Sequence, residues 1–383
     1  MHRILIGGDI VPTKSNYHLF SEGDVNTLFG DELIKTINAS THLIFNLECP
    51  LVDDLSPIEK SGPALWAPKT TVETFKKLSP SLITLANNHI MDQGSLGLYS
   101  TLKLLDDCNI SHIGAGENLS EARAPYYINI ENKKVGVYAC AEHEFSIITR
   151  YTPGANPIDL LETPDVIENL KKTCDFLIIL YHGGKEYYRY PSPQLQKVCR
   201  KLVDKGADLI ICQHSHCIGS MEKYNNGTII YGQGNFLFDG SEDECWQTSM
   251  LIALDENFNI EYIPIEKKKN VVRMSNTYNK NKILNEFFSR STEILSEKVI
   301  NEKYDKIVNK EIDSYLLGLS GIRTTVLYFI INKIFFHKLT PMIVKCKYNK
   351  KKLLSIKNHI ECEPHRELLL NGLNQKLKSI NKK

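Results

Sequence analysis

Seven polar side chains that could bind metal ions or transfer protons stand directly after short apolar runs of strand length. They are Asp9, Glu48, Asn88, His89, His182, His214 and His216. Carboxylate, amide and imidazole groups together suit manganese, iron or zinc, whereas an all-oxygen set would favour magnesium or calcium. One such histidine is usually structural, but side chains of this kind after five runs predict a common transition-metal site, and the mixed donor set leaves the metal open.

The runs that carry these side chains alternate with amphipathic segments. Apolar runs of strand length cover residues 4–8, 43–45, 82–86, 176–180, 209–212 and 228–232, and apolar residues recur at helical spacing in 72–78, 96–107 and 195–205. This alternation is typical of an α/β sheet covered by helices. Ligands of such sheets bind beyond the carboxyl ends of the strands, where the polar side chains stand.

Composition excludes several classes of protein. The 383 residues contain 46 Lys+Arg and 45 Asp+Glu, a net charge of +1, which argues against a nucleic-acid partner. The ten cysteines form no C-x-x-C pair and lie mostly in or beside apolar runs, which favours a reducing compartment over a disulfide framework. No long apolar stretch follows the N-terminal residues, so we expect no signal peptide. The glycine-rich nucleotide motifs and the G-x-S-x-G nucleophile motif are also absent from the sequence.

The C-terminal third has a different character. A strand is expected near 135–139 and a hairpin from 250–253 and 260–265, after which Lys267-Lys268-Lys269-Asn270 suggests a boundary between domains at 1–265 and 271–383. The second domain is expected to be helical, and residues 341–383 hold 11 Lys+Arg against 3 Asp+Glu. This basic tail is either a solvated face or a surface for an anionic partner. The apolar window 324–336 is either a buried helix or an interfacial membrane contact, because it is too short to span a bilayer.

Six motifs, in order, identify a known family. They are GGD at 7–9, NLECPL at 46–51, LANNHIMDQG at 85–94, HGGKEYY at 182–188, QHSHCIG at 213–219 and YGQGNFLFD at 231–239. With these motifs the sequence resembles the CapA family of poly-gamma-glutamate capsule synthesis proteins, whose domain is similar to the calcineurin-like metallophosphoesterases. The resemblance covers the predicted first domain, 1–265, and does not extend to the C-terminal third.

The resemblance implies a four-layer α/β/β/α sandwich that holds two divalent transition metals, manganese, iron or zinc. Glu48 would bridge the metals, Asp9 and His216 would complete one site, and Asn88, His182 and His214 would complete the other. The sequence departs from the phosphoesterase pattern at two points that it shares with the CapA family. The usual D-x-H is Asp9-Ile10-Val11, and the bridging residue is a glutamate instead of an aspartate.

The same resemblance leaves His89 as the general acid, with Asp92 in a position to orient it. Lys60 and Lys185 could neutralise an anionic substrate, although each could equally be a solvated lysine. Glu186 is a candidate for substrate binding or for support of the site, and Asn235 for the pocket wall.

The leading hypothesis is therefore a metal-dependent hydrolase of the CapA type, acting on a phosphoester or on an anionic, poly-gamma-glutamate-like polymer or its precursor in capsule or cell-envelope synthesis. The alternative is a non-catalytic component that binds metal and polymer and docks on a membrane-associated synthesis complex, with capsule synthesis proteins or the membrane surface as partners of the C-terminal extension. A third hypothesis is a hydrolase of a small soluble phosphodiester. We expect a cytoplasmic protein or one held peripherally at the membrane.

Overall fold

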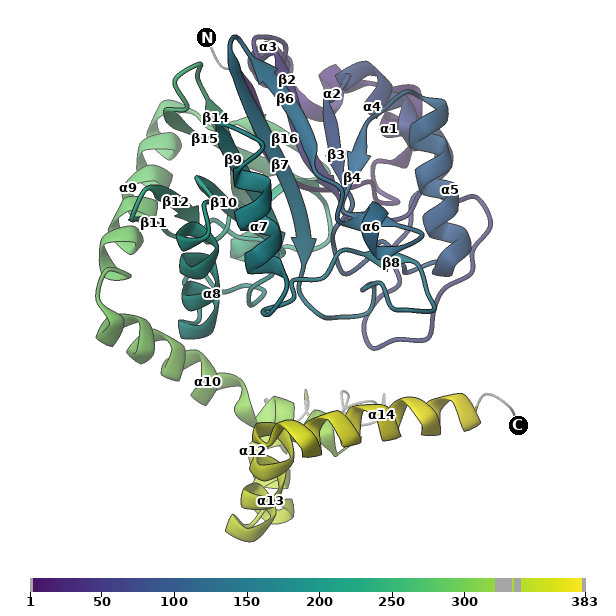
Figure 1. Ribbon diagram of the computed structural model, residues 1–383, viewed down its shortest axis with the longest axis vertical. Coiled ribbons are helices and arrows are strands. Elements are labelled where there is room, and N and C mark those ends of the chain that lie inside the picture. The colour runs from purple at the N-terminus through teal and green to yellow at the C-terminus, as the bar shows by residue number, and fades with distance from the viewer. Residues whose placement is uncertain (1–2, 321–332, 334–338, 381–383) are drawn as a thin grey trace. The chain divides into compact units, whose positions relative to one another are not determined.

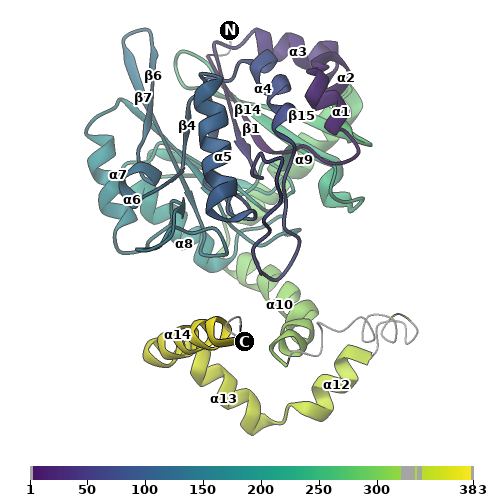
Figure 2. The same ribbon diagram turned by 90° about the vertical axis from the view of Figure 1, so that its right-hand side faces the viewer.

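The chain folds into two compact units, residues 1–301 and 302–383. A computed structural model describes residues 3–320, 333 and 339–380. Figures 1 and 2 show the first unit as two sheets packed against each other, with helices on both outer faces. None of the described helices is long and apolar enough to cross a lipid bilayer.

Sixteen strands form the sheets of the described first unit. They are β1 (Ile4–Val11), β2 (His42–Leu47), β3 (Leu82–Thr84), β4 (His112–Ile113), β5 (Ala115–Gly116), β6 (Tyr126–Ile130), β7 (Lys133–Ala141), β8 (Gly154–Ala155), β9 (Phe176–His182), β10 (Leu209–Gln213), β11 (Met221–Tyr224), β12 (Gly227–Ile230), β13 (Asn235–Phe238), β14 (Thr248–Leu254), β15 (Ile260–Lys268) and β16 (Val271–Met274). The first large sheet has the order β16-β15-β14-β1-β2-β3-β4, with β13 paired to β1, and the second has the order β11-β12-β10-β9-β7-β6. The remaining two strands, β5 and β8, form a small sheet of their own.

Nine α-helices accompany the sheets in the described part of this unit. They are α1 (Tyr17–Glu22), α2 (Val25–Phe29), α3 (Asp31–Asn38), α4 (Val72–Leu78), α5 (Gly94–Asp107), α6 (Leu119–Ala122), α7 (Thr163–Lys171), α8 (Pro193–Asp204) and α9 (Thr277–Glu293). The longest of them are α5, α8 and α9. Helix α8 begins at Pro193 after Ser192, whose hydroxyl accepts a hydrogen bond from the backbone of Leu195, so the sequence itself supplies the start of this helix.

Alternating side chains of the second sheet separate two hydrophobic cores. In β7, Val135 and Val137 lie in the core that the two sheets share, whereas Tyr138 and Cys140 point into a second core. That second core also contains Ile167 of α7 and residues of α8. Because successive side chains of a strand point to opposite faces, the first core lies between the sheets and the second lies under the helices. This is the α/β/β/α sandwich expected from the sequence.

Strand β1 changes its neighbour halfway along its length. Ile4–Ile6 pair with β14, whereas Asp9–Val11 pair with β13, and the register of β1 against β2 shifts between Ile6 and Asp9. A Cβ at Gly8 would lie only 2.0 Å from the carbonyl oxygen of Gly234, so only glycine lets the two backbones approach here. The shift brings Asp9 to the edge of the sheet where the candidate ligands gather.

The boundary between the units lies later than the sequence indicated. The predicted hairpin at 250–265 is confirmed as β14 and β15, but β15 runs through the lysine run to Lys268 and is followed by β16. Lys267 is buried, and its ammonium group donates to Asp239 at 3.0 Å and to the carbonyl of Ser241 at 2.7 Å. A charged run that resembled a linker therefore belongs to an internal strand, and the first unit continues through α9 to residue 301.

The second unit is helical, as expected. Its described helices are α10 (Glu297–Leu319), which begins in the first unit, α12 (Leu339–Lys347), α13 (Lys350–Glu361) and α14 (Glu363–Ile380). Leu316, Leu317 and Val344 form a small core of its own. The apolar window 324–336 lies outside the described residues except for Lys333.

Candidate metal centre

The candidate ligands gather at the carboxyl ends of strands from both sheets. Asp9 lies in the second half of β1, Glu48 directly follows β2, and Asn88 follows β3. His182 ends β9, and His214 directly follows β10. All five side chains are buried, as is that of His216. The six residues predicted as ligands thus lie together, and their binding of metal stays a prediction.

Two groups of ligand atoms share one carboxylate. Glu48 lies with Asp9 and His182 in one group, and with His214 and His216 in the other, and within each group the ligand atoms are no more than 4.8 Å apart. Nε2 of His182 is 3.2 Å from Oε1 of Glu48, and its Nδ1 is 3.7 Å from Oδ1 of Asp9. The shared position of Glu48 agrees with the expected bridge. His182 also contacts the other members of its expected site, since its Nε2 is 3.0 Å from Oδ1 of Asn88 and its ring centroid is 4.9 Å from that of His214, so the division of the ligands between two metals stays a prediction.

Several buried polar atoms in these groups have no hydrogen-bond partner among the described residues. They include both carboxylate oxygens of Glu48 and Nδ1 of His214. A buried carboxylate without hydrogen bonds costs several kcal/mol unless another positive charge compensates it. These atoms are oxygen and nitrogen donors that a divalent transition metal accepts, so the residues present fit the expected metals.

Burial moves every titratable group of the cluster toward its neutral form. The pKa of Asp9 is raised to about 7 by burial and by the nearby charge of Glu48. The pKa of Glu48 is raised to about 8, mainly by burial. Burial also lowers the pKa of His216 to about 3, and it lowers those of His182 and His214. Neutral imidazoles are the form that binds metal, and a cation would favour the charged carboxylates that burial disfavours.

Two side chains contact the imidazole rings of the His214-Ser215-His216 motif. Nε2 of His214 is 3.4 Å from Oε1 of Glu142, whose other oxygen accepts a hydrogen bond from the backbone of Gly184 at 2.9 Å. Nδ1 of His216 is 2.8 Å from Oδ1 of Asn235. Side chains that contact one nitrogen of an imidazole commonly orient the other toward a metal. Asn235 therefore contacts a predicted ligand, and its expected place in the pocket wall stays a prediction.

The backbone of the same motif is bent. His214 has a φ of 78° and His216 a φ of 54°, a left-handed conformation that non-glycine residues rarely adopt. Tyr187 donates its backbone N–H to the carbonyl of Ser215 between them at 2.9 Å. The bend turns two residues that are two apart in sequence toward the same carboxylate.

His89, Asp92 and Lys60 form a hydrogen-bonded group beside the cluster, in which the side chain of Asp92 is fully buried. Oδ2 of Asp92 is 2.5 Å from Nδ1 of His89 and accepts a hydrogen bond from the backbone of Leu65, while its Oδ1 accepts one from the ammonium of Lys60. The contact to Nδ1 leaves Nε2 of His89 as the nitrogen for proton transfer. The side chain of Lys60 is only 2% exposed. It therefore pairs with Asp92 and is not a solvated lysine.

Acidic residues that sequence reasoning missed line the same region. Glu144 accepts a hydrogen bond from the side-chain amide of Asn88 at 2.6 Å, and Glu142 contacts an imidazole as described above. The pKa of Glu186 is raised by burial, and its charge also raises the pKa of Glu48, so Glu186 lies near the cluster. Lys185 precedes it, with its ammonium 3.4 Å from the carbonyl of Glu186. The sequence signal that could have identified Glu142 and Glu144 is their position directly after a strand, β7.

Two asparagines also support the site without having been assigned a role. Asn46 donates from its amide to Oδ1 of Asp9 at 2.8 Å. Asn87 donates to Oδ1 of Asn46 at 3.1 Å, and its own oxygen accepts from the backbone of His89 at 3.1 Å. This chain of hydrogen bonds connects β1, β2 and the loop after β3, so it holds a predicted ligand and the predicted general acid in one network.

Comparison with known proteins places the chain among capsule proteins. Residues 3–240 match the family described as Bacterial capsule synthesis protein PGA_cap. Capsule biosynthesis protein CapA of Bacillus anthracis is 32% identical over 209 residues, which cover 52% of this chain and 51% of the relative. PGA biosynthesis protein CapA of Bacillus subtilis (strain 168) is 32% identical over 178 residues, 45% of this chain and 46% of the relative. The chain thus spans about half the length of these relatives.

Solved structures with a similar arrangement are more distant. A phosphatase of Mycoplasma pneumoniae has a TM-score of 0.42 and 15% identity, with coverage of 74% of this chain and 99% of that chain. The 5'-nucleotidase precursor of Thermus thermophilus has a TM-score of 0.39 and 13% identity, with coverage of 74% and 57%. The family match is the decisive comparison, because it covers more than half of the chain and includes every predicted metal ligand. The protein therefore belongs to the family of bacterial capsule synthesis proteins named PGA_cap, as the six motifs indicated.

Proposed function

We propose that the chain is a metal-dependent hydrolase of the CapA type, acting on a phosphoester or on a poly-gamma-glutamate-like polymer or its precursor during capsule or cell-envelope polymer synthesis. The names of the Bacillus relatives support the capsule context. The observation that carries the proposal is Glu48, a buried carboxylate without hydrogen bonds that lies within two groups of ligand atoms.

The proposed metal sites use the residues around that carboxylate. Asp9, Glu48 and His182 would hold one divalent transition metal, and Glu48, His214 and His216 would hold the other. Asn88 is the sixth proposed ligand, and its Oδ1 is 3.0 Å from Nε2 of His182. Two such cations supply Lewis-acid polarisation of the scissile phosphoryl or acyl group. Manganese, iron and zinc all suit this donor set.

The proton transfer is assigned to His89. Asp92 holds its Nδ1, so Nε2 is directed away from Asp92 and can donate a proton to the leaving group. Lys60 neutralises part of the charge of Asp92 at the same time, since its ammonium contacts Oδ1. With Lys60 engaged in this way, Lys185 is the remaining candidate of the two lysines for contact with an anionic substrate.

Metal analysis and hydrolysis assays test the proposal together. Purified full-length protein should contain about two transition-metal equivalents per chain, a stoichiometry taken from two-metal hydrolases. Glu48→Gln should lose most of this metal. His89→Asn should keep the metal and lose at least ~100-fold in kcat on model phosphodiesters or gamma-glutamyl oligomers, the usual contribution of a general acid.

A second histidine–aspartate pair supplies the matched control. Nε2 of His112 in β4 is 3.1 Å from Oδ1 of Asp106, and His112 pairs with Ile83 of β3, ahead of the loop that carries Asn88. His112→Asn should retain both metal and activity. Full activity of His89→Asn would overturn the catalytic assignment. Retained metal with no turnover of any tested substrate by the native protein would favour the non-catalytic component that binds metal and polymer.

A further inference from the structure

The two units carry opposite net charges. Residues 1–301 contain 29 Lys+Arg and 38 Asp+Glu, a net charge of −9, whereas residues 302–383 contain 17 and 7, a net charge of +10. So large a positive charge on the smaller unit favours an anionic partner for it. It also disfavours close association between two copies of that unit.

Helix α14 presents an apolar stripe to solvent. On one face of the helix the exposed large apolar side chains recur three or four residues apart, at Leu370, Leu373, Leu377 and Ile380, and Leu369, four residues before Leu373, adjoins them. Residues at this spacing lie on one face of a helix. Leu373 and Leu377 are 49% and 59% exposed, so nothing among the described residues covers the stripe.

Helix α13 begins with three lysines, whose positive charges lie at the positively charged end of the helix dipole. Lys350, Lys351 and Lys352 form its first turn, which contains no acidic residue, and all three are exposed. The N-terminus of a helix carries partial positive charge, so three cations there destabilise the isolated helix. An anionic surface would offset both the lysine charges and the helix dipole.

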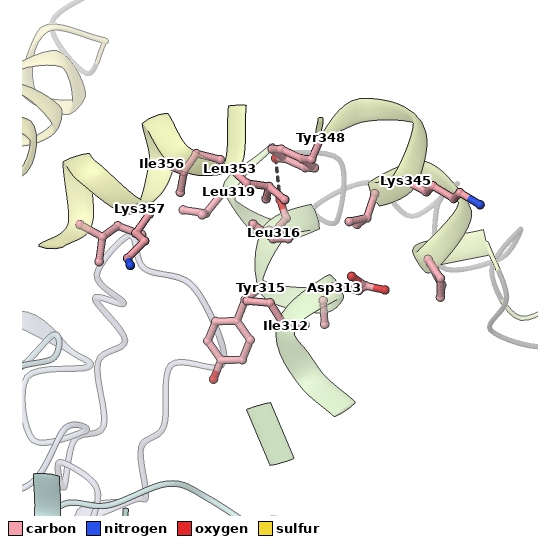
Figure 3. Close-up of a pocket in the computed structure, with 15 residues that line it drawn as sticks. Ile312, Asp313, Tyr315, Leu316, Leu319, Lys345, Tyr348, Leu353, Ile356 and Lys357 are labelled. Carbon is pink, nitrogen blue, oxygen red and sulfur yellow. Dashed lines mark hydrogen bonds between the residues drawn. The ribbon is translucent and has the colours of Figure 1, made fainter. Parts of the chain in front are cut away.

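An apolar groove lies in the same unit (Figure 3). It has a volume of about 1190 Å³ and is lined by residues of α10, α12 and α13, among them Leu316, Leu353 and Ile356. Lys345 and Lys357 stand on its two sides, and Tyr348 donates its hydroxyl to the carbonyl of Leu316 at 2.7 Å. Apolar lining with flanking lysines suits amphiphiles that have anionic head groups.

We propose that the second unit docks on the surface of an anionic lipid bilayer through the α14 stripe and the lysines of α13. Leucine side chains would enter the interface between head groups and acyl chains, while the lysines contact the head groups. A soluble anionic polymer would account for the lysines but not for the exposed leucines. The surface involves only residues 339–380 and does not depend on the metal centre.

Vesicle co-sedimentation of the full-length protein tests this surface. The native protein should bind vesicles that mix phosphatidylglycerol into phosphatidylcholine, and it should bind pure phosphatidylcholine vesicles much less. Lys350→Gln/Lys351→Gln/Lys352→Gln should weaken binding by about 100-fold, since each lysine near an anionic surface contributes about 1 kcal/mol. Leu373→Gln/Leu377→Gln should weaken it by roughly 100-fold through lost apolar burial, and glutamine preserves the helix.

Leu160→Gln/Leu161→Gln is the matched control, because both leucines are exposed in the first unit, at 57% and 85%. This variant should bind like the native protein, and circular dichroism should show equal helix content in all four proteins. Equal binding to both vesicle types, or native-like binding by Leu373→Gln/Leu377→Gln, would overturn the proposal. A dimer in light scattering that this leucine variant converts to monomer would instead assign the stripe to a second copy. These outcomes are distinct from failure of the hydrolase assignment, since none involves metal or turnover.

Discussion

Replacing Glu48 by glutamine in metal-free protein should make the first unit more stable at alkaline pH. Neither carboxylate oxygen has a hydrogen-bond partner in the part of the chain that the structure describes, and burial raises the pKa of this carboxyl from 4.5 to about 8. Folded Glu48 therefore holds a proton that the unfolded chain has released at every pH between about 4.5 and about 8. The free energy of unfolding falls as the pH rises through this window, and the loss is complete above about pH 8.

The size of the effect follows from the pKa shift. One pKa unit corresponds to about 1.36 kcal/mol, so the native protein should lose about 4 kcal/mol between pH 5 and pH 8 through this residue. Glu48→Gln lacks the titration, and its stability relative to the native protein should rise by about this amount over the same range. The variant should also lower the pKa of Asp9 toward its ordinary value, because the charge of Glu48 contributes to the raised pKa of Asp9.

Urea unfolding followed by tryptophan fluorescence measures the effect after metals are removed with a chelator. The sequence contains two tryptophans, Trp66 and Trp246, and both lie in the first unit, so the signal reports on that unit alone. Parallel stability curves for the two proteins between pH 5 and pH 8 would refute the reasoning.

The control is a glutamate that is buried but has partners. Glu222 pairs with Arg200 at 2.7 Å and accepts the hydroxyl of Tyr231. Glu222→Gln should destabilise the protein at pH 8, by roughly 1.5 kcal/mol, because it weakens the charge-assisted hydrogen bonds from Arg200, whose side chain is 35% exposed to screening by water. The two substitutions should therefore act in opposite directions at the same pH.

Three further substitutions probe the architecture of the site. Glu142→Gln should weaken metal affinity about 10–100-fold, because the amide holds the ring of His214 less firmly, and titration calorimetry with Mn²⁺ measures this; unchanged affinity would contradict the orienting contact. Gly8→Ala should lower the free energy of unfolding by ~3 kcal/mol or more, since its Cβ would collide with the carbonyl oxygen of Gly234, and a native-like thermal midpoint would be inconsistent with that contact. Asp92→Asn should reduce kcat by ~100-fold on any substrate that the native protein hydrolyses, with little change in KM, whereas a change in KM alone would assign Asp92 to substrate binding.

The sequence predicted the site best where side chains directly follow strands. Asp9, Glu48 and His214 were found because apolar runs of strand length end at or near them, and parallel strands bring their carboxyl ends to one edge. Glu142 directly follows β7 in the same way, but position after a strand does not by itself show which side chain of Glu142-His143-Glu144 contacts the site. Its contact with His214 depends on the paths of two loops, which local sequence does not determine.

Lys60 and Lys267 show a second limit of sequence reasoning. Each lies in a polar segment that suggests exposure, yet each is buried and paired with an aspartate. Whether a lysine is solvated or paired depends on a carboxylate that is distant in sequence, so composition cannot decide it. For the same reason the domain boundary was predicted too early in the chain, because the lysine run that includes Lys267 forms part of β15.

The pairing of β1 with β13 and β14 has a consequence for the order in which the protein can mature. Asp9 is made near the start of synthesis, but its strand neighbours are Asn46 in β2 and Asn235 in β13, and the latter is made only after most of the other strands. A nascent chain therefore cannot complete this sheet, or bring all the candidate ligands together, until most of the first unit has left the ribosome. Loading with metal would then occur after synthesis of the unit, and a chain truncated before β13 should retain none of the site's affinity.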